Sequence, residues 1–523
     1  MKPPCDQAVI ESGHPGVPCT KAAEPWILAV TILGSSMAFI DGTVVNVALP
    51  AIQRTLGGTV IDMQWVVEGY GLLLGALILA GGAMGDVFGR RRMFLGGVTV
   101  FAIASAGCGL AAHIRELVIS RAVQGFGAAF LVPGSLSIIS ASFSEKERGR
   151  AIGTWSGFTS IATATGPVLG GWLIEHASWR WVFFINLPFA VAVIVLSLLR
   201  LPETRIDAPS GIDWIGALTV TAGLAGVTYG FIESGDLGWN NTSVWGALVV
   251  GCACLIAFSY FEARAHSPMV PLGLFRSPGF TGANLLTFFL YAPLGIFFFL
   301  FPLNLIQVQH YSATATGAAA LPLILLMFLL SRWSGGLVDR FGAKGPLMVG
   351  PAIAAAGFLL FVIPSVGGSY WTTFFPGFVV LGLGMAVSVA PLTTVVMGAV
   401  ERNHAGTASG INNAVARIAG LLAIAILGMV MVGAFRDHMN QSLTQLNMPF
   451  DVIQSVQSSA TRLAAIAVPA GIDSSAAAEV RVSIDRAFVF GFRLIMLICA
   501  GLSAASSGFA WRMIAVDAKR DLV

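Results

Sequence analysis

The chain has 523 residues, of which 56% are hydrophobic and 11% are charged, and its mean hydropathy is +0.82. A water-soluble chain of this length would divide into about three or four domains joined by polar linkers, and the sequence contains no such linkers. Composition therefore excludes a soluble multidomain protein. The formal net charge of +3 indicates no nucleic-acid-binding surface.

The apolar residues occur in blocks of about 18 to 25 residues, the length with which a helix crosses a bilayer core of about 30 Å. Membrane strands would give alternating segments of about 10 residues instead. The sequence thus predicts an all-α integral membrane protein with fourteen transmembrane helices. In chain order, the helices are expected to begin near Trp26, Asp62, Met93, Arg115, Ala151, Trp181, Asp213, Val244, Phe280, Thr316, Pro346, Tyr370, His404 and Ala487.

These elements predict an N-terminal six-helix half, two inserted helices and a C-terminal six-helix half. The expected boundaries are a tail at 1–25, the first half at 26–200, the inserted helices and their loops at 201–279, the second half at 280–512 with an outer loop at 435–486, and a tail at 513–523.

Loop charges predict the orientation of the chain. With the N-terminus inside, most Lys and Arg residues of the connecting loops lie on the cytoplasmic side, as the positive-inside rule requires. We expect no cleaved signal peptide before the first span. We expect both termini in the cytoplasm of a bacterium and the helices in its inner membrane.

The sequence gives no indication of a cofactor. The six cysteines and seven histidines have no metal-ligand spacing, and no phosphate-binding GxxxxGK[ST] loop occurs. We therefore expect no metal, no cofactor and no ATP hydrolysis.

One cytoplasmic loop sequence occurs twice. "GAMGDVFGRR", from Gly82 to Arg91, aligns with "GGLVDRFGAK", from Gly335 to Lys344, at an offset of 253 residues. Repeated halves around a central site are typical of secondary transporters.

Five motifs extend this interpretation: "DGTVVNVALP" from Asp41, the first loop copy, "RAVQGFGAA" from Arg121, "GFTSIATATGPVLGG" from Gly157 and "WRWVFFINLP" from Trp179. In this order they resemble the fourteen-helix drug:proton antiporter family of the major facilitator superfamily, over essentially the whole chain. Two positions depart from the loop motif: Val87 replaces a basic residue in the first copy, and Ala343 replaces an arginine in the second.

The resemblance implies roles for two motifs. The loop motif is expected to act as a conformational latch through Gly82, Asp86, Gly89, Arg90, Arg91, Asp339 and Arg340. The alternative is that its arginines only obey the positive-inside rule. The antiporter motif, with Gly157, Gly166, Pro167, Gly170 and Gly171, is expected to let its helix bend and seal, in a family that exports in exchange for protons. Ordinary small-residue packing is the alternative.

Ionisable side chains within membrane helices are costly and indicate function. Asp41, Glu68 and Arg121 lie in the outer halves of three predicted helices, so we expect them to couple transport to protons. The alternative is a static buried ion pair.

The expected substrate pocket is less sharply defined. Its candidates are Trp65, Tyr70, Phe126, Phe158, Tyr291, Asn413 and Arg417. For the aromatic residues the alternative is packing or contact with lipid. Arg417 would bind an anionic substrate group or pair with a carboxylate or carbonyl.

These observations predict a proton-coupled antiporter, not an enzyme, that exports amphipathic, cationic or lipophilic small molecules by alternating access. A dedicated exporter of one metabolite, antibiotic or siderophore is the nearest alternative, followed by an importer and by a non-transporting membrane sensor. The expected partners are a small-molecule substrate, protons and the lipid bilayer, with no nucleic acid, and a monomer is the expected state.

Overall fold

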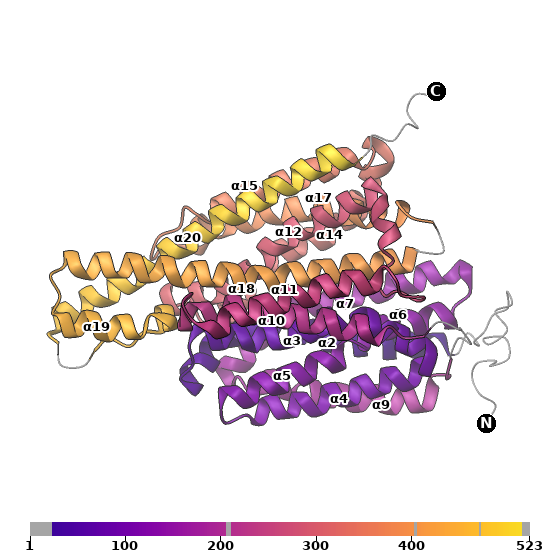
Figure 1. Ribbon diagram of the computed structural model, residues 1–523, viewed down its shortest axis with the longest axis horizontal. Helices are drawn as coiled ribbons and strands as arrows, with labels where there is room; N and C mark the ends of the chain where they lie inside the picture. Colours follow the sequence, from indigo (N-terminus) through magenta and orange to yellow (C-terminus); the bar gives the residue numbers. More distant parts are fainter. Residues whose placement is uncertain (1–22, 205–210, 402–404, 470–471, 515–523) are drawn as a thin grey trace. The chain divides into compact units, whose positions relative to one another are not determined.

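A computed structural model describes residues 23–204, 211–401, 405–469 and 472–514 (Figure 1). Most of both predicted tails, at 1–25 and 513–523, lies outside the described residues. Contacts group the chain into two compact units. Unit 1 contains residues 1–48, 65–225 and 252–271, and unit 2 contains residues 49–64, 226–251 and 272–523.

Twelve helices in the described part of the chain are long and apolar enough to cross a membrane. Two further helices occupy the remaining two predicted spans without meeting both criteria: α7 (Glu145–His176) has 32 residues and α15 (Lys344–Leu360) has 17 residues. Each of the fourteen predicted apolar blocks corresponds to a helix or to two consecutive helical segments. The all-α membrane fold is confirmed.

Unit 1 is built around helices that begin and end near the predicted loops. Its elements are α2 (Glu24–Leu56) and α3 (Val60–Phe88), whose facing ends at 49–64 belong to unit 2, then α4 (Arg90–Leu110), α5 (Ile114–Ala128), α6 (Leu131–Ser142), α7, α8 (Trp181–Phe184) and α9 (Asn186–Arg200). Helix α4 packs against α5, α6, α8 and α9.

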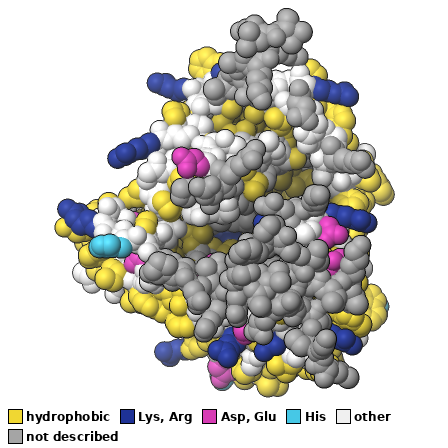
Figure 2. Space-filling view, turned by 90° about the vertical axis from the view of Figure 1, so that its right-hand side faces the viewer, with side chains coloured by type: hydrophobic (Ala, Val, Ile, Leu, Met, Phe, Trp, Pro, Cys, Tyr) yellow, Lys and Arg dark blue, Asp and Glu magenta, His cyan; other side chains and the backbone are white. Residues whose placement is uncertain are grey.

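The inserted pair consists of α10 (Trp214–Leu237) and α11 (Thr242–Glu262), and both helices pass from one unit to the other. Large hydrophobic side chains are exposed along them, for example Leu218, Trp245 and Ile256. Hydrophobic side chains also cover much of the described surface in Figure 2. Such exposure suits helices that face lipid.

Unit 2 contains the second set of helices. They are η1 (Leu272–Arg276), α12 (Pro278–Leu303), the π-helical turn η2 (Asn304–Val308), α13 (Ala313–Ala319), α14 (Leu321–Phe341), α15, α16 (Tyr370–Thr373), α17 (Phe375–Gly398), α18 (Ala405–Gln445), α19 (Phe450–Ser458), η4 (Ala460–Ala465) and α20 (Ser474–Met513). Helix α15 packs against α17 and α20, and α12 packs against α18 and α20.

The segment 435–486, predicted as an outer loop, is mostly helical. Helix α18 continues to Gln445, and α20 already begins at Ser474. Between them lie α19 and η4, and α19 buries Val452 and Val456. A hydropathy reading ends a span where charges begin, whereas helical hydrogen bonding continues beyond the apolar stretch.

Candidate functional site

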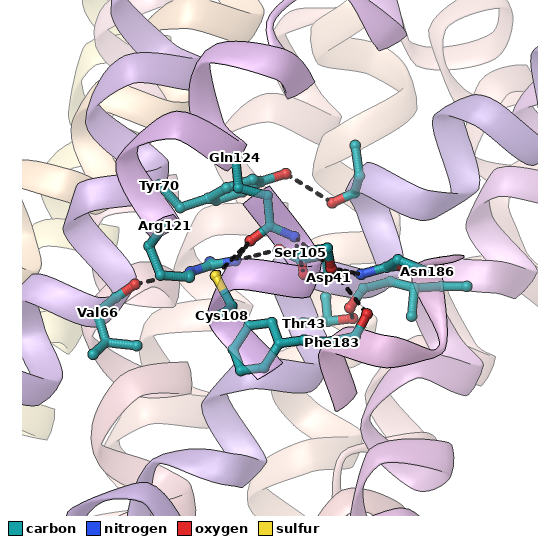
Figure 3. Close-up of polar contacts among 12 residues, drawn as sticks. Asp41, Thr43, Val66, Tyr70, Ser105, Cys108, Arg121, Gln124, Phe183 and Asn186 are labelled. Carbon is teal, nitrogen blue, oxygen red and sulfur yellow. Dashed lines mark hydrogen bonds and ion pairs between the residues drawn. The ribbon is translucent and has the colours of Figure 1, made fainter. Parts of the chain in front are cut away.

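Asp41 and Arg121 form a buried ion pair in unit 1. Asp41 comes from the middle of α2 and is 0% exposed, whereas Arg121 comes from α5 and is 1% exposed. The Asp41 carboxylate accepts a hydrogen bond from Nη1 of Arg121 (Figure 3). Burying two charges is expensive unless they are paired and their other polar atoms are satisfied.

Three neutral side chains complete this pair. Gln124 donates from Nε2 to Oδ1 of Asp41 (2.8 Å) and accepts from Nη1 of Arg121 at Oε1 (2.7 Å). Asn186, at the start of α9, donates to the same Asp41 oxygen (3.3 Å) and to Oγ of Ser105 (3.0 Å). These five residues, from α2, α4, α5 and α9, are called the polar cluster below.

Arg121 is also held from α3. Its Nε donates to the Val66 carbonyl (3.0 Å), and its guanidinium carbon lies 4.3 Å from the centre of the Tyr70 ring. The Tyr70 hydroxyl in turn donates to the Ala38 carbonyl (3.0 Å). Tyr70, predicted as a pocket wall, is only 5% exposed and supports the guanidinium through a cation–π contact.

Glu68 lies on α3 between Val66 and Tyr70 and is 1% exposed. In the described part of the chain, neither of its carboxylate oxygens has a hydrogen-bond partner. The sequence placed Glu68 in the same layer as Asp41 and Arg121. The structure buries all three, but Glu68 makes no hydrogen bond or ion pair with the polar cluster among the described residues.

The antiporter motif presses against α2 next to Asp41. A Cβ atom on Gly166 would lie 2.5 Å from Oγ1 of Thr43, and one on Gly170 would lie 2.1 Å from Cγ2 of Val44. Pro167 lies inside α7 between these two glycines. Apart from the adjoining residues and backbone of α7 itself, no described atom lies within 4 Å of the position that a Gly157 Cβ would take, so close packing does not require this glycine.

The first loop motif forms a compact turn between α3 and α4. Gly89 has a φ of 104°. The next residue, Arg90, forms an ion pair with Asp86 (2.8 Å) and donates a hydrogen bond to the Ser137 carbonyl (3.2 Å). A Cβ atom on Gly82 would lie 3.5 Å from Cβ of Pro133, which is an ordinary van der Waals distance.

Glu203, which the sequence reasoning missed, closes this turn. It accepts from the backbone nitrogen of Arg91 (3.1 Å), and its carboxylate lies 3.7 Å from Nε of both Arg91 and Arg92. A Cβ atom on Gly89 would lie 2.6 Å from Oε1 of Glu203. Gly89 thus provides both the positive φ and the space for this carboxylate.

The second loop copy is less complete in its described side chains. Asp339 lies within α14, but its side chain is outside the described residues, and Arg340 is exposed in the last turn of the same helix. Gly342 ends α14 with φ of 70°.

Unit 2 contains a polar cavity of about 130 Å³. Its lining residues come from α12, α17 and α18: Tyr291, Thr393, Val396, Ser409, Asn412, Asn413 and Ala416. Two of the predicted pocket residues, Tyr291 and Asn413, therefore lie together. Arg417 follows Ala416 on α18 and is not among the lining residues.

The other predicted pocket residues belong to unit 1 and do not line this cavity. Phe126 is 41% exposed and Phe158 is 55% exposed. Trp65 is half-buried at the start of the unit 1 part of α3. Among the residues that the structure describes, no group of three or more His, Cys, Asp or Glu side chains is placed to hold a metal ion.

Sequence reasoning missed Gln124, Asn186 and Ser105. Gln124 lies inside the quoted motif "RAVQGFGAA", and Asn186 lies inside "WRWVFFINLP". A neutral amide in an apolar helix was the available signal, because a buried amide needs hydrogen-bond partners.

Comparisons with known proteins agree with this fold. The family model described as Major Facilitator Superfamily matches residues 31–424. The tetracenomycin C resistance and export protein of Streptomyces glaucescens is 33% identical over 431 residues, which are 81% of this chain and 79% of that protein. The multidrug resistance protein Stp of Mycobacterium tuberculosis is 36% identical over 412 residues, 77% of this chain and 75% of that protein.

A solved structure shares the fold at lower sequence identity. It is the crystal structure of a bacterial homolog to the human lysosomal transporter Spinster, in an inward-facing and unoccupied conformation. The match has a TM-score of 0.64 and 18% identity, and it covers 95% of this chain and all of that one.

Proposed function

This chain belongs to the major facilitator superfamily, and we propose that it is a proton-coupled antiporter that exports amphipathic small molecules across the bacterial inner membrane. The proposal covers a vectorial reaction in which the substrate is not chemically changed. Relatives named for antibiotic export and multidrug resistance support it. The structural observation that carries it is the buried Asp41–Arg121 pair, which contacts α3 at Val66 and Tyr70, on either side of a second buried carboxyl residue, Glu68.

The polar cluster is suited to take up and release a proton. As an anion, Asp41 is satisfied by Arg121 and by the amide nitrogens of Gln124 and Asn186. When Asp41 takes a proton, its charge no longer holds Arg121, while a neighbouring amide oxygen can accept from the new hydroxyl. Protonation therefore weakens the ionic attraction between α2 and α5 without leaving the carboxyl group unsatisfied.

The antiporter motif provides a route from this change to helix movement. Gly166 and Gly170 bring α7 against Thr43 and Val44, which follow Asp41 on α2. A shift of α2 after protonation must therefore move or reseat α7, whose Pro167 interrupts the helical hydrogen bonding. We propose that this coupling drives alternating access.

We propose that the Glu68 carboxyl group is a second proton-binding site. A carboxylate with no counter-charge is costly in a buried site, whereas a protonated carboxyl group is far less so. Moving one charge through a potential of about 100 mV supplies about 2.3 kcal/mol, which makes an electrogenic exchange energetically useful.

The test is proton-gradient-driven transport of ethidium in proteoliposomes. Asp41→Asn should abolish uphill export while leaving downhill exchange, because asparagine imitates the protonated carboxyl group. Glu68→Gln should weaken the coupling. Asp451→Asn, the same chemical change at an exposed carboxylate on α19, is the matched control and should transport normally. Uphill pumping by Asp41→Asn at the wild-type rate would place the proton site elsewhere.

A dedicated antibiotic exporter is the second candidate. The name of the Streptomyces glaucescens relative refers to one compound, tetracenomycin C. A panel of chemically unrelated compounds in an efflux-deficient host separates the candidates, since a multidrug exporter should protect against several classes and a dedicated exporter against one.

We also propose that both termini are cytoplasmic, on the basis of the loop charges. In a cysteine-free background, Gln457→Cys on α19 should react with an impermeant thiol reagent in intact cells. Ala263→Cys, just after α11, should react only in inverted vesicles. The opposite pattern would reverse the orientation.

A further inference from the structure

One polar side chain of the unit 2 cavity, Asn412, is fixed in place by hydrogen bonds. Nδ2 of Asn412 donates to Oδ1 of Asn284 (3.1 Å) and to Oγ1 of Thr287 (2.6 Å), both on α12. Asn284 is itself held, because its Nδ2 donates to the Phe280 carbonyl (2.9 Å). These bonds use the amide hydrogens of Asn412 and leave its side-chain oxygen as an acceptor at the cavity.

Other polar groups at the cavity have no partner within the described chain. Within the described ranges, no hydrogen bond involves the side chains of Tyr291, Ser409 or Asn413. Together with Asn412 they present hydroxyl and amide groups that both donate and accept. Thr393 differs, because its hydroxyl already donates to the Val389 carbonyl (3.1 Å).

Every residue that lines the cavity is uncharged at neutral pH. A carboxylate would be expected at a site that selects cations, and an arginine or lysine at a site that selects anions. The lining instead matches hydroxyl, ether or carbonyl groups, which both donate and accept hydrogen bonds without carrying charge.

The volume limits the size of the group that fits. At about 130 Å³ the cavity is slightly smaller than an apolar protein cavity of about 150 Å³ that holds one benzene molecule. The cavity therefore encloses about as much as one unsubstituted six-membered ring, and the hydroxyl groups of a larger ring would extend beyond it. A polar wall of hydroxyls and amides favours a hydroxylated ring over an aromatic hydrocarbon.

We propose that this cavity binds a single uncharged, hydroxylated ring of the exported compound, such as a sugar attached to a larger apolar body. The inference rests on the proposed export function and specifies its substrate class. It departs from the cationic or lipophilic substrates expected from sequence, because the ring is neutral and polar.

The test compares two uncharged fluorescent probes, the methyl ether and the glucoside of umbelliferone, which share an apolar body and differ in the hydroxylated ring. Binding to the purified full-length protein is measured at equilibrium without a proton gradient. The glucoside should bind about tenfold more tightly, since it gains several hydrogen bonds that the ether cannot make.

Tyr291→Phe combined with Asn413→Leu should lower the glucoside affinity to that of the methyl ether and so remove this preference. Thr394→Val on the same helix is the matched control, because it removes a hydroxyl that donates to the Ala390 carbonyl (3.1 Å) and does not line the cavity, and it should retain the preference. Tyr291→Phe alone should lower the preference and keeps the fold testable if the double variant is unstable.

Equal affinities for the two probes, or an unchanged preference in the double variant, would overturn the inference. Proton-gradient-driven transport of the two probes and of ethidium by the same preparation tests the export function separately. Pumping without glucoside preference would refute the ring site alone, whereas glucoside preference without pumping would refute proton-driven export alone.

Discussion

The two loop copies both turn at a glycine with positive φ, but the helices that follow them have different cores. Gly89 and Gly342 are separated by the repeat offset of 253 residues, and both have positive φ, 104° and 70°. The same offset carries Ser105 and Arg121 of the polar cluster to Phe358 and Phe374. The repeat therefore retains the turn and replaces the polar side chains.

Phenylalanines form the corresponding core of unit 2. Six phenylalanines from α12, α15 and α17, or from positions flanking α15 and α17, are at most 2% exposed. They are Phe297, Phe301, Phe358, Phe361, Phe374 and Phe378. The offset relates them to Val44, Ala48, Ser105, Cys108, Arg121 and Gly125. Their ring centres approach to 4.8 Å for Phe297–Phe361 and 4.9 Å for Phe301–Phe378.

This difference separates stability from proton chemistry. Buried aromatic rings stabilise a core directly and offer nothing to titrate. A buried ion pair contributes little net stability and is retained for another reason. In the proposed mechanism the proton-dependent step therefore belongs to unit 1, and the phenylalanine core of unit 2 gives apolar support.

The largest effect is expected for Arg121→Leu, which leaves Asp41 buried without its counter-charge. Loss of one partner of a buried pair costs about 3–5 kcal/mol. Thermal unfolding in detergent should therefore occur at a lower temperature, and uphill export should be lost. Adding Asp41→Asn should recover much of the stability and none of the export. Recovery of export in the double variant would contradict the assignment of coupling to this pair.

Phe378→Ala in the unit 2 core should have an equally large effect on stability alone. Removing a buried phenylalanine ring costs about 3–5 kcal/mol. The unfolding temperature should fall, but the number of protons exchanged per substrate should stay as in wild type. Phe378→Leu is the milder control. A changed number of protons exchanged per substrate in Phe378→Ala would contradict the assignment of proton coupling to unit 1 alone.

Gly170→Ala tests whether the polar core communicates with α7. Its Cβ atom would lie 2.1 Å from Cγ2 of Val44, and overpacking of this kind costs about 1–3 kcal/mol. Export should fall while the protein still reaches the membrane, and Val44→Ala should restore part of it. Gly157→Ala, in the same helix but with no described atom within 4 Å, should transport normally. Equal effects of the two glycine substitutions would show that the motif contributes only helix flexibility and not close packing against α2.

The sequence predicted the helices and the ion pair better than the polar partners around it. Hydropathy located the membrane-length helices because the bilayer sets span length, but it missed α19 and the helical ends of α18 and α20 in the segment 435–486. Asp41 and Arg121 stood out because charges within spans are rare. Gln124 and Asn186 did not, since neutral polar residues are common in membrane helices and only tertiary packing identifies their partners. Glu203 was missed because it lies more than 100 residues from the arginines it contacts.

The smallest effect is expected for Glu203→Gln at the first loop turn. Glutamine keeps an oxygen that can accept from the backbone nitrogen of Arg91 and removes only the charge facing Arg91 and Arg92. Partly exposed ion pairs contribute about 0–1 kcal/mol, so stability should change little. Gly89→Ala should be more damaging, because its Cβ atom meets Glu203 at 2.6 Å and φ of 104° strains any other residue. Combining Gly89→Ala with Glu203→Ala removes the collision but keeps the backbone strain, so export should recover only in part. Full recovery would show that space for the carboxylate, rather than the turn shared with Gly342, is what requires glycine there.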